Sequence, residues 1–313
     1  MDYTTLGRAG IRVSRMGLGG GGHSRLGKRS GAEEQASIDI VKRALDLGVN
    51  FIDTAESYGT EEIVGHGIRG RAREHVVLST KKTMWGDRAV TPSDLRTGLE
   101  QSLRRLGTDY VDVYHLHGLK LDRYEHAVTM LVPEMIKLRD EGKIRAVGVT
   151  EAFGGDTGHA MLKRAMRDDC WDVIMVGFNI LNQSARESVL APAREKNVGT
   201  LCMFAVRSAL SQPTKLRDVV RGLVDSGKVD RAMVEEPEDP LGFLVRDGVA
   251  PSVVNAAYRF CRDEPGLHVI LSGTGNVAHL EENVAALNDP PLPAGVRERL
   301  NEMFRGVESI SGN

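Results

Sequence analysis

Cysteine is scarce in this sequence. Only Cys170, Cys202 and Cys261 occur among 313 residues, and no Cys-x-x-Cys pattern is present. The odd number and the wide spacing argue against a framework of disulfide bonds. We therefore expect three reduced thiols that act as small core residues, as is typical of a cytoplasmic protein.

Three further absences exclude large classes of function. The 41 basic and 43 acidic side chains leave a formal net charge of −2, so nothing marks the chain as a binder of nucleic acid or of an anionic membrane. No stretch approaches the roughly 18 apolar residues of a membrane span. Residues 1–5 lack the basic and apolar regions of a secretory signal. These features predict a cytoplasmic globular protein whose partner is a small molecule, and they leave its oligomeric state open.

Short apolar segments alternate with amphipathic helical patterns along most of the chain. Regular alternation of this kind implies parallel strands joined by right-handed crossovers. Eight such units within about 300 residues favour a closed (β/α)8 barrel, the TIM barrel, over an open sheet. We expect one α/β domain over residues 1–313, with strands at residues 15–19, 49–53, 75–80, 110–116, 143–149, 171–176, 199–204 and 267–271.

Two segments fall outside the repeat. Residues 1–14 contain two β-like pieces around a turn and predict a hairpin cap. Residues 207–251, after the seventh strand, form a long connection with several prolines. Long connections at the carboxyl end of a barrel strand are usually functional, so we expect an active-site loop or lid there. A helical insertion without a role is the alternative.

Polar side chains stand at the carboxyl ends of three successive predicted strands. Asp53, Lys81 and His117 end these strands, and Tyr58 follows Asp53 by five residues. Neighbouring strands lie about 4.8 Å apart, so the four groups can meet at the barrel mouth. A nearby ammonium favours the phenolate and lowers the pKa of a phenol from its usual value of about 10, while a carboxylate keeps the lysine charged. The set therefore predicts tuned proton transfer. His115 and His117 could also chelate a metal, but no third ligand stands at a recognisable spacing, so no metal is predicted.

These residues and their order carry a resemblance to a known family. The chain resembles the aldo-keto reductases over nearly its whole length, and the opening residues 6–14 look like the hairpin that closes the barrel bottom in that family. The segments that carry the resemblance are residues 51–55 with 58–59, 78–81, 109–117, 142–150, 178–182 and 279–283.

The resemblance implies hydride transfer between a nicotinamide cofactor and a carbonyl or alcohol group of an aldehyde, ketone or sugar. Tyr58 would give the proton to the developing alkoxide, Lys81 and Asp53 would tune the phenol, and His117 would orient the carbonyl. Trp85 would form a substrate wall, and an ordinary buried aromatic is its alternative.

The resemblance also places the cofactor contacts, with departures from the family. Thr150 and Glu151 stand where the family has the Ser-Asn pair that holds the carboxamide, and Met175 replaces a glutamine. Phe204 keeps the aromatic residue that stacks on the nicotinamide. Ala205 replaces a serine that contacts the pyrophosphate, and Arg207 could compensate by its charge.

Phosphate is expected at the segment after the last strand, where a helix begins. The residues concerned are Ser272, Gly273, Thr274, Gly275 and Asn276, and Asn283 matches the position that contacts adenine. We predict NADP(H) in preference to NAD(H), although Gly275 stands where members that prefer NADPH carry a basic residue.

Three alternatives stay open. Residues 17–22 match Gly-x-Gly-x-x-Gly, but a basic loop instead of a helix follows, which disfavours a dinucleotide-binding Rossmann unit. Lys81 could act as the nucleophile of a Schiff-base aldolase. Finally, some relatives of the aldo-keto reductases bind the cofactor as regulatory subunits.

Overall fold

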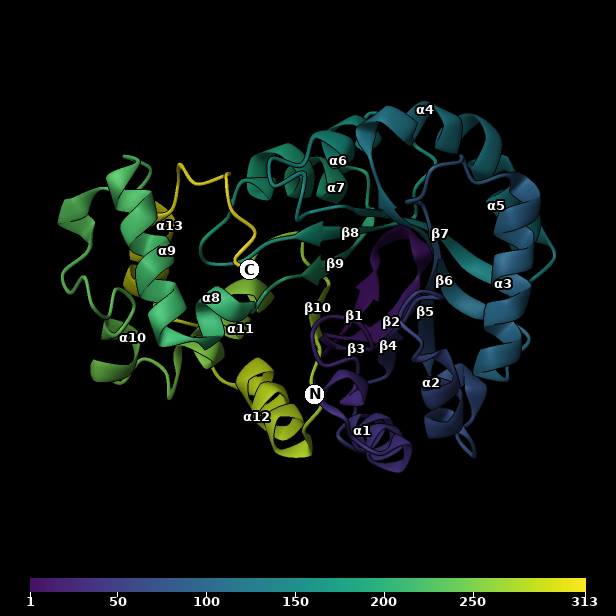
Figure 1. The fold of residues 1–313 in the computed structure, drawn as a ribbon, viewed down its shortest axis with the longest axis horizontal. Coiled ribbons are helices and arrows are strands. Elements are labelled where there is room, and N and C mark those ends of the chain that lie inside the picture. Colours follow the sequence, from purple (N-terminus) through teal and green to yellow (C-terminus); the bar gives the residue numbers. More distant parts are fainter.

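A closed parallel barrel forms the centre of the molecule, as the alternation predicted (Figure 1). The computed structural model describes residues 1–313, and the strands follow one another around the barrel in the order β10-β3-β4-β5-β6-β7-β8-β9. Each predicted strand is present with small shifts at its ends. The bounds are β3 (Met16–Gly19), β4 (Phe51–Asp53), β5 (Val77–Thr83), β6 (Val111–Leu119), β7 (Ile144–Glu151), β8 (Val173–Gly177), β9 (Gly199–Met203) and β10 (Val269–Ser272).

Helices cover the outside of the barrel. The side chains of Thr91 and Asp94 form a capping box that starts α3 at Pro92, so both orphan N–H groups are satisfied there. None of the helices combines the length and the apolar character needed to cross a bilayer. The helices around the barrel are α1 (Glu34–Asp46), α2 (Glu61–Ile68), α3 (Pro92–Leu106), α4 (Tyr124–His126), α5 (Val132–Asp140), α6 (Ala160–Ala165), α7 (Ala191–Glu195), α11 (Val253–Arg262) and α12 (Val277–Asn288).

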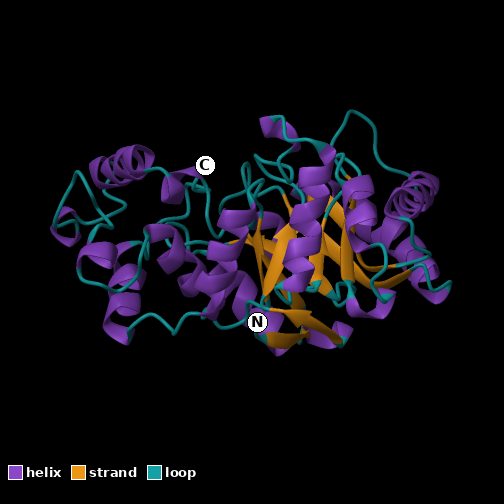
Figure 2. Cartoon of the chain, turned by 90° about the horizontal axis from the view of Figure 1, so that it is seen from below, coloured by secondary structure: helices purple, strands orange, loops and turns teal.

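The predicted hairpin closes one end of the barrel. Strands β1 (Tyr3–Leu6) and β2 (Ile11–Ser14) pair antiparallel, and Figure 2 shows this small sheet below the barrel, beside the N-terminus. Leu6, Ile11 and Val13 are buried and join the apolar side chains of the barrel interior in one cluster. The interior is therefore a packed core at this end and not an open channel.

The Gly-x-Gly-x-x-Gly segment belongs to the barrel. Met16–Gly19 is the strand β3, which pairs in parallel with β10 and β4. A loop over residues 20–33 follows, and α1 begins only at Glu34. The Rossmann alternative is wrong, because that unit needs its helix directly after the glycines.

The long connection after β9 is mostly helical. It contains α8 (Ser208–Ser211), which lies beside α11, and α9 (Pro213–Asp225) and α10 (Phe243–Arg246), which lie farther out at one side of the barrel (Figure 1). Arg299 of α13 (Ala294–Met303) packs on the ring of Phe243 in α10. Residues at its two ends, 206–215 and 251–252, include those that line the cavity described below. The expectation of one long active-site loop over residues 207–251 is corrected accordingly.

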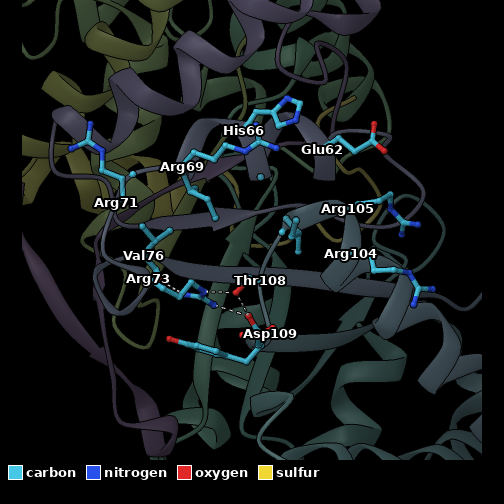
Figure 3. Close-up of a pocket in the computed structure, with 16 residues that line it drawn as sticks. Glu62, His66, Arg69, Arg71, Arg73, Val76, Arg104, Arg105, Thr108 and Asp109 are labelled. Atoms are coloured by element: carbon cyan, nitrogen blue, oxygen red, sulfur yellow. Dashed lines mark hydrogen bonds between the residues drawn. The ribbon is translucent and has the colours of Figure 1, made fainter.

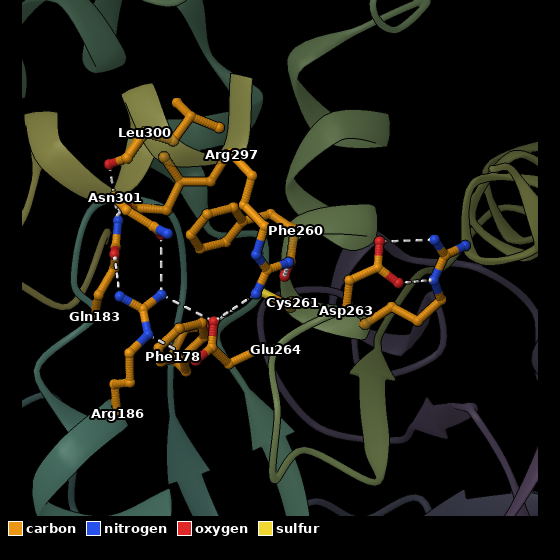
Figure 4. Close-up of polar contacts among 12 residues, drawn as sticks. Phe178, Gln183, Arg186, Phe260, Cys261, Asp263, Glu264, Arg297, Leu300 and Asn301 are labelled. Carbon is orange, nitrogen blue, oxygen red and sulfur yellow. Dashed lines mark hydrogen bonds and ion pairs between the residues drawn. The ribbon is translucent and has the colours of Figure 1, made fainter. Parts of the chain in front are cut away.

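A buried carboxylate fastens the C-terminal helix to the barrel. Glu264 accepts two hydrogen bonds from Arg186, at 2.7 and 2.8 Å, and a third from Arg297 of α13 at 2.7 Å (Figure 4). Arg186 also bonds Asn301, and Gln183 donates to the carbonyl of Leu300. Since the Glu264 side chain is almost wholly buried, its two guanidinium partners are needed to offset the loss of hydration.

Candidate active site

A cavity of about 1380 Å³ opens at the carboxyl ends of the barrel strands. Its wall includes Gly19 at the end of β3, Asp53 at the end of β4, Met203 at the end of β9 and Gly273 just after β10. In a barrel of this type, this face collects the loops that carry function. The cavity is therefore the first place to look for the predicted site residues.

Tyr58 and His117 meet beside this cavity. The phenolic oxygen of Tyr58 lies 3.1 Å from Nε2 of His117, and the two rings stand edge to face. The indole of Trp85 packs against the same imidazole, with ring centroids 4.7 Å apart. Trp85 is half exposed, so the alternative of an ordinary buried aromatic is wrong. Gly118 leaves room for the indole, because a β-carbon there would lie 3.1 Å from it.

Lys81 and Asp53 form a buried ion pair beneath the phenol ring. Nζ of Lys81 lies 2.6 Å from each carboxylate oxygen of Asp53 and 2.5 Å from the carbonyl oxygen of Thr54. Ser79 donates a further hydrogen bond to Asp53 at 2.7 Å. The two oxygens of Asp53 and the carbonyl oxygen of Thr54 can take all three ammonium protons of Lys81. Lys81 therefore approaches the ring of Tyr58, 5.1 Å from its centroid, without a bond to the hydroxyl.

The electrostatics of the cluster favour a protonated phenol. Burial raises the pKa of Tyr58 and the charge of Asp53 raises it further, while Arg25 and Arg207 act in the opposite direction. The lowered pKa predicted from the nearby lysine is therefore wrong, because burial is the largest effect and raises the pKa of Tyr58. Burial, followed by the charge of Lys81, holds the pKa of His117 well below its usual value. A neutral phenol thus faces a neutral imidazole.

The buried lysine is subject to opposing effects. Burial lowers the pKa of the Lys81 ammonium, whereas the charge and hydrogen bonds of Asp53 raise it. The two 2.6 Å contacts with the carboxylate are those of a charged pair. We therefore treat Lys81 as an ammonium ion in the folded protein.

Most residues predicted to hold a cofactor line the same cavity. Thr150, Glu151 and Ser272 are absent from its wall, as are Lys81, His117 and Trp85, which lie just beyond it. The predicted cofactor residues on the wall are Phe204, Arg207, Gly273, Thr274, Gly275, Asn276 and Asn283.

The predicted carboxamide pair is engaged elsewhere. Thr150 accepts a hydrogen bond from the N–H of Gly118 at 2.7 Å. Glu151 is buried, with both carboxylate oxygens 3.0 Å from Nδ1 of His159 and one oxygen 2.7 Å from the N–H of Gly177. Because Glu151 is buried, already bonded and absent from the cavity wall, this arrangement disfavours its predicted contact with the nicotinamide carboxamide. His159, which no sequence pattern marked, has a left-handed backbone (φ 60°), and its ring faces Glu151.

Two cations stand on the cavity wall without acidic partners. The guanidinium of Arg207 lies 4.1 Å from the ring centroid of Phe204, and its Nε donates to the side chain of Asn313 at 2.6 Å. Lys215 donates to the hydroxyl of Ser208 at 2.7 Å. Cations that face a cavity and lack a carboxylate are suited to phosphate groups.

The segment after β10 brings backbone to the cavity. A β-carbon at Gly273 would lie 3.1 Å from the carbonyl oxygen of Gly19, so the two loops touch there. Asn276 caps α12 by accepting from the N–H groups of Ala278 and His279. Asn283 donates to Ser272, which makes Ser272 a support for Asn283 and not part of the wall.

A glycine-rich cradle and two cations on one cavity fit a dinucleotide with a charged diphosphate. No comparable site for a metal ion is present. The structure contains no group of three or more histidine, cysteine, aspartate or glutamate side chains arranged to hold a metal ion.

A second cavity, of about 630 Å³, lies between α2 and α3 (Figure 3). Its wall is rich in arginine, but the charges are largely paired, because Arg71 meets Asp46, Arg105 meets Glu61 and Arg73 meets the buried carboxylate of Asp112. We assign no function to it.

Comparisons with known proteins point to one family. A profile described as "Aldo/keto reductase family" matches residues 15–304. The NADH-specific methylglyoxal reductase of Escherichia coli (strain K12) is 29% identical over 92% of this chain and 94% of that protein. Aldo-keto reductase YhdN of Bacillus subtilis (strain 168) is 30% identical over 90% of this chain and 87% of that protein. The holo form of aldo-keto reductase AKR11C1 from Bacillus halodurans superposes with a TM-score of 0.72 at 22% identity, covering 99% of this chain and 98% of that one.

Proposed function

Since this chain belongs to the aldo/keto reductase family, we propose that it transfers a hydride between a nicotinamide dinucleotide and the carbonyl carbon of a small substrate, with Tyr58 as the proton donor. One observation carries the proposal. The phenol of Tyr58 lies 3.1 Å from His117 and above a buried Lys81–Asp53 pair, at the edge of a cavity lined by glycines and cations.

Each side chain has a distinct part in the proposed reaction. The bound cofactor would supply the hydride. The neutral phenol of Tyr58 would then protonate the oxygen of the reduced carbonyl, and His117 would hold the phenol and the substrate oxygen in line through Nε2. The ammonium of Lys81 lies under the ring and would stabilise the phenolate that remains, while Asp53 keeps that ammonium in place.

The cofactor would lie along the cavity wall. Phe204 would face the nicotinamide, and Arg207 with Lys215 would face the diphosphate. Gly273, Thr274, Gly275 and Asn276 would approach phosphate through backbone, with Asn283 near the adenine. No arginine or lysine between Ser272 and Asn283 supports the predicted preference for NADP(H), and the Escherichia coli relative is named NADH-specific. Titrations of NADH and NADPH therefore test that preference directly.

The aldolase alternative is disfavoured by the surroundings of Lys81. A Schiff-base nucleophile must offer a free amine to its substrate, whereas the ammonium of Lys81 is enclosed by Asp53 and Thr54 and is fully buried.

A regulatory, cofactor-binding role is the second candidate, because the same wall would bind the cofactor without turnover. Oxidation of NADH and NADPH, followed by absorbance against a panel of aldehydes, ketones and sugars, tests the choice. We expect turnover on at least one carbonyl compound, and loss of turnover in Tyr58→Phe. Tight cofactor binding with no turnover on any compound would favour the regulatory role.

A further inference from the structure

The loop over residues 20–33, which joins β3 to α1, holds the segment that carries Tyr58. The N–H of Gly20 donates to the carbonyl of Asp53 at 2.6 Å, and Thr60 donates to the carbonyl of Gly20 at 3.1 Å. The ring of Tyr58 rests on the backbone of Gly21, where a β-carbon would lie 2.6 Å from the ring. The loop over residues 20–33 therefore contacts the segment of Tyr58 before Tyr58, after it and at its ring.

Two cations of this loop bind backbone carbonyls next to the phenol. Nη1 of Arg25 lies 3.2 Å from the carbonyl oxygen of Tyr58, and Nζ of Lys28 lies 2.9 Å from that of Gly59. Neither cation pairs with a carboxylate, and neither lines the large cavity. Their hydrogen bonds fix the backbone on which the phenol is mounted, and they do so without contacting the expected cofactor site.

The loop itself is anchored and strained. Arg25 and Leu26 both have left-handed backbones, with φ of 47° and 58°, which is unfavourable for residues other than glycine. Leu26 is fully buried in the main core, so its packing can hold the strained turn in place. This turn aims Arg25 at Tyr58.

The far side of the loop touches the expected phosphate segment. A β-carbon at Gly275 would lie 2.6 Å from the Cα of Gly27, so the two backbones are in direct contact. The loop thus lies between the segment of Tyr58 and the segment that begins at Gly273.

We propose that the loop over residues 20–33 is a positioning element for Tyr58, in which Arg25 and Lys28 hold the carbonyls of Tyr58 and Gly59 while Gly21 supports the phenol ring. Arg25 and Lys28 are positioning residues and not catalytic ones, since their side chains bond only backbone carbonyls of the Tyr58 segment. The charge of Arg25 also lowers the pKa of Tyr58, an effect that Arg25→Lys retains. The proposal rests on the proposed function, because it concerns the geometry of the proton donor.

The test compares Arg25→Met, Lys28→Met and the double variant with Arg29→Met. Arg29 is exposed in the same loop, and its side chain makes no hydrogen bond or ion pair, so it controls for loss of charge. We expect kcat to fall about tenfold in Arg25→Met, less in the exposed Lys28→Met, and on the order of a hundredfold in the double variant. The Kd of the reduced cofactor, measured by its fluorescence, should stay within about twofold.

Two further readouts separate positioning from a loss of fold. The solvent deuterium isotope effect on kcat should rise in the double variant, because proton transfer becomes rate-limiting, whereas a smaller folded fraction would leave it unchanged. Arg25→Lys retains a cationic donor and should recover most of kcat. Gly21→Ala should lower kcat without any change of charge, because its methyl group displaces the ring.

Failure of this inference is distinguishable from failure of the proposed function. If Tyr58→Phe is inactive while the double variant keeps the kcat and isotope effect of the wild type, the positioning role is wrong and the proton donor stands. If Tyr58→Phe keeps full activity, the proposed function fails and the positioning role fails with it.

Discussion

Nε2 of His117 lies 3.1 Å from the phenolic oxygen of Tyr58, although 59 residues separate the two along the chain. The barrel brings them together, because β4 and β6 flank β5 and all three end at the same face. Both rings are largely shielded from water, which keeps each of them neutral. This pair is the centre of the proposed chemistry and the first target for mutation.

Replacement of Tyr58 by phenylalanine tests the proton donor. The ring can stay on Gly21, so only the hydroxyl is lost. We expect kcat to fall by a factor on the order of 10² to 10⁴, the usual contribution of a positioned acid. Cofactor Kd should change little. Steady-state kinetics combined with a fluorescence titration measure both quantities, and an unchanged kcat would remove Tyr58 from the mechanism.

Removal of Lys81 should destabilise the protein as well as inactivate it. Lys81→Met leaves the carboxylate of Asp53 buried without its ammonium partner, which typically costs about 3–5 kcal/mol. The double variant Lys81→Met, Asp53→Asn should recover part of this loss. Urea unfolding of the three proteins measures the difference, and equal stability of Lys81→Met and wild type would show that the pair is not charged.

The loss of folding stability at acid pH should depend on His268. Its Nδ1 accepts a hydrogen bond from the backbone N–H of Thr200 at 3.2 Å, and burial lowers the pKa of His268 to about 4, with Arg15 acting in the same direction. The folded state thus binds a proton less readily than the unfolded state, whose pKa is about 6.5. Stability from this group is complete above pH ~6.5 and is lost as the pH falls toward ~4. The urea midpoint of His268→Gln should fall less steeply over this range, and parallel curves for the two proteins would contradict the assignment.

A conservative change at Glu151 distinguishes a structural role, in which Glu151 binds His159 and Gly177, from a contact with the nicotinamide carboxamide. Glu151→Gln weakens the hydrogen bonds to His159 and Gly177 and should lower the thermal midpoint. Since the side chain does not reach the cavity wall, the cofactor Kd should stay within about twofold. A rise in Kd of tenfold or more, with an unchanged thermal midpoint, would restore the carboxamide contact that the sequence suggested.

Arg207 should contribute to cofactor affinity through charge. Arg207→Met removes a cavity-facing guanidinium, and loss of a charged hydrogen bond worth about 1.5–3 kcal/mol raises Kd by roughly ten- to a hundredfold. The dependence of Kd on salt should weaken as well. Lys163→Met, a charge change on α6 outside the cavity wall, is the matched control, and a similar effect in both variants would argue against a local contact.

The strands and the three polar residues at their predicted ends, Asp53, Lys81 and His117, could be predicted because two simple patterns specify them. Apolar runs mark each strand, and polar residues at their ends must share one face of a barrel. The register then decides the details: Asp53 pairs with Ser79, and Lys81 follows two residues later on the same side of β5.

The errors arose where tertiary contacts override local patterns. Pro213 suggested a loop, yet it begins α9, where its missing N–H costs no helical hydrogen bond. Glu151 matched a family position, but the pairing with His159 depends on a left-handed turn eight residues later, which no periodicity announces. Arg25 precedes and Lys28 begins a single 3-10 turn (Lys28–Ser30) that no apolar periodicity marks, so their contacts could not be predicted from spacing.

The hairpin of β1 and β2 and the apolar core above it close one end of the barrel, so ligands reach the site from the carboxyl ends of the strands. A ligand bound deeper in that cavity must enter before, and leave after, one bound nearer its rim. If the dinucleotide lies deeper than the carbonyl compound, the two must therefore arrive in a fixed sequence, and product inhibition patterns would reveal that order.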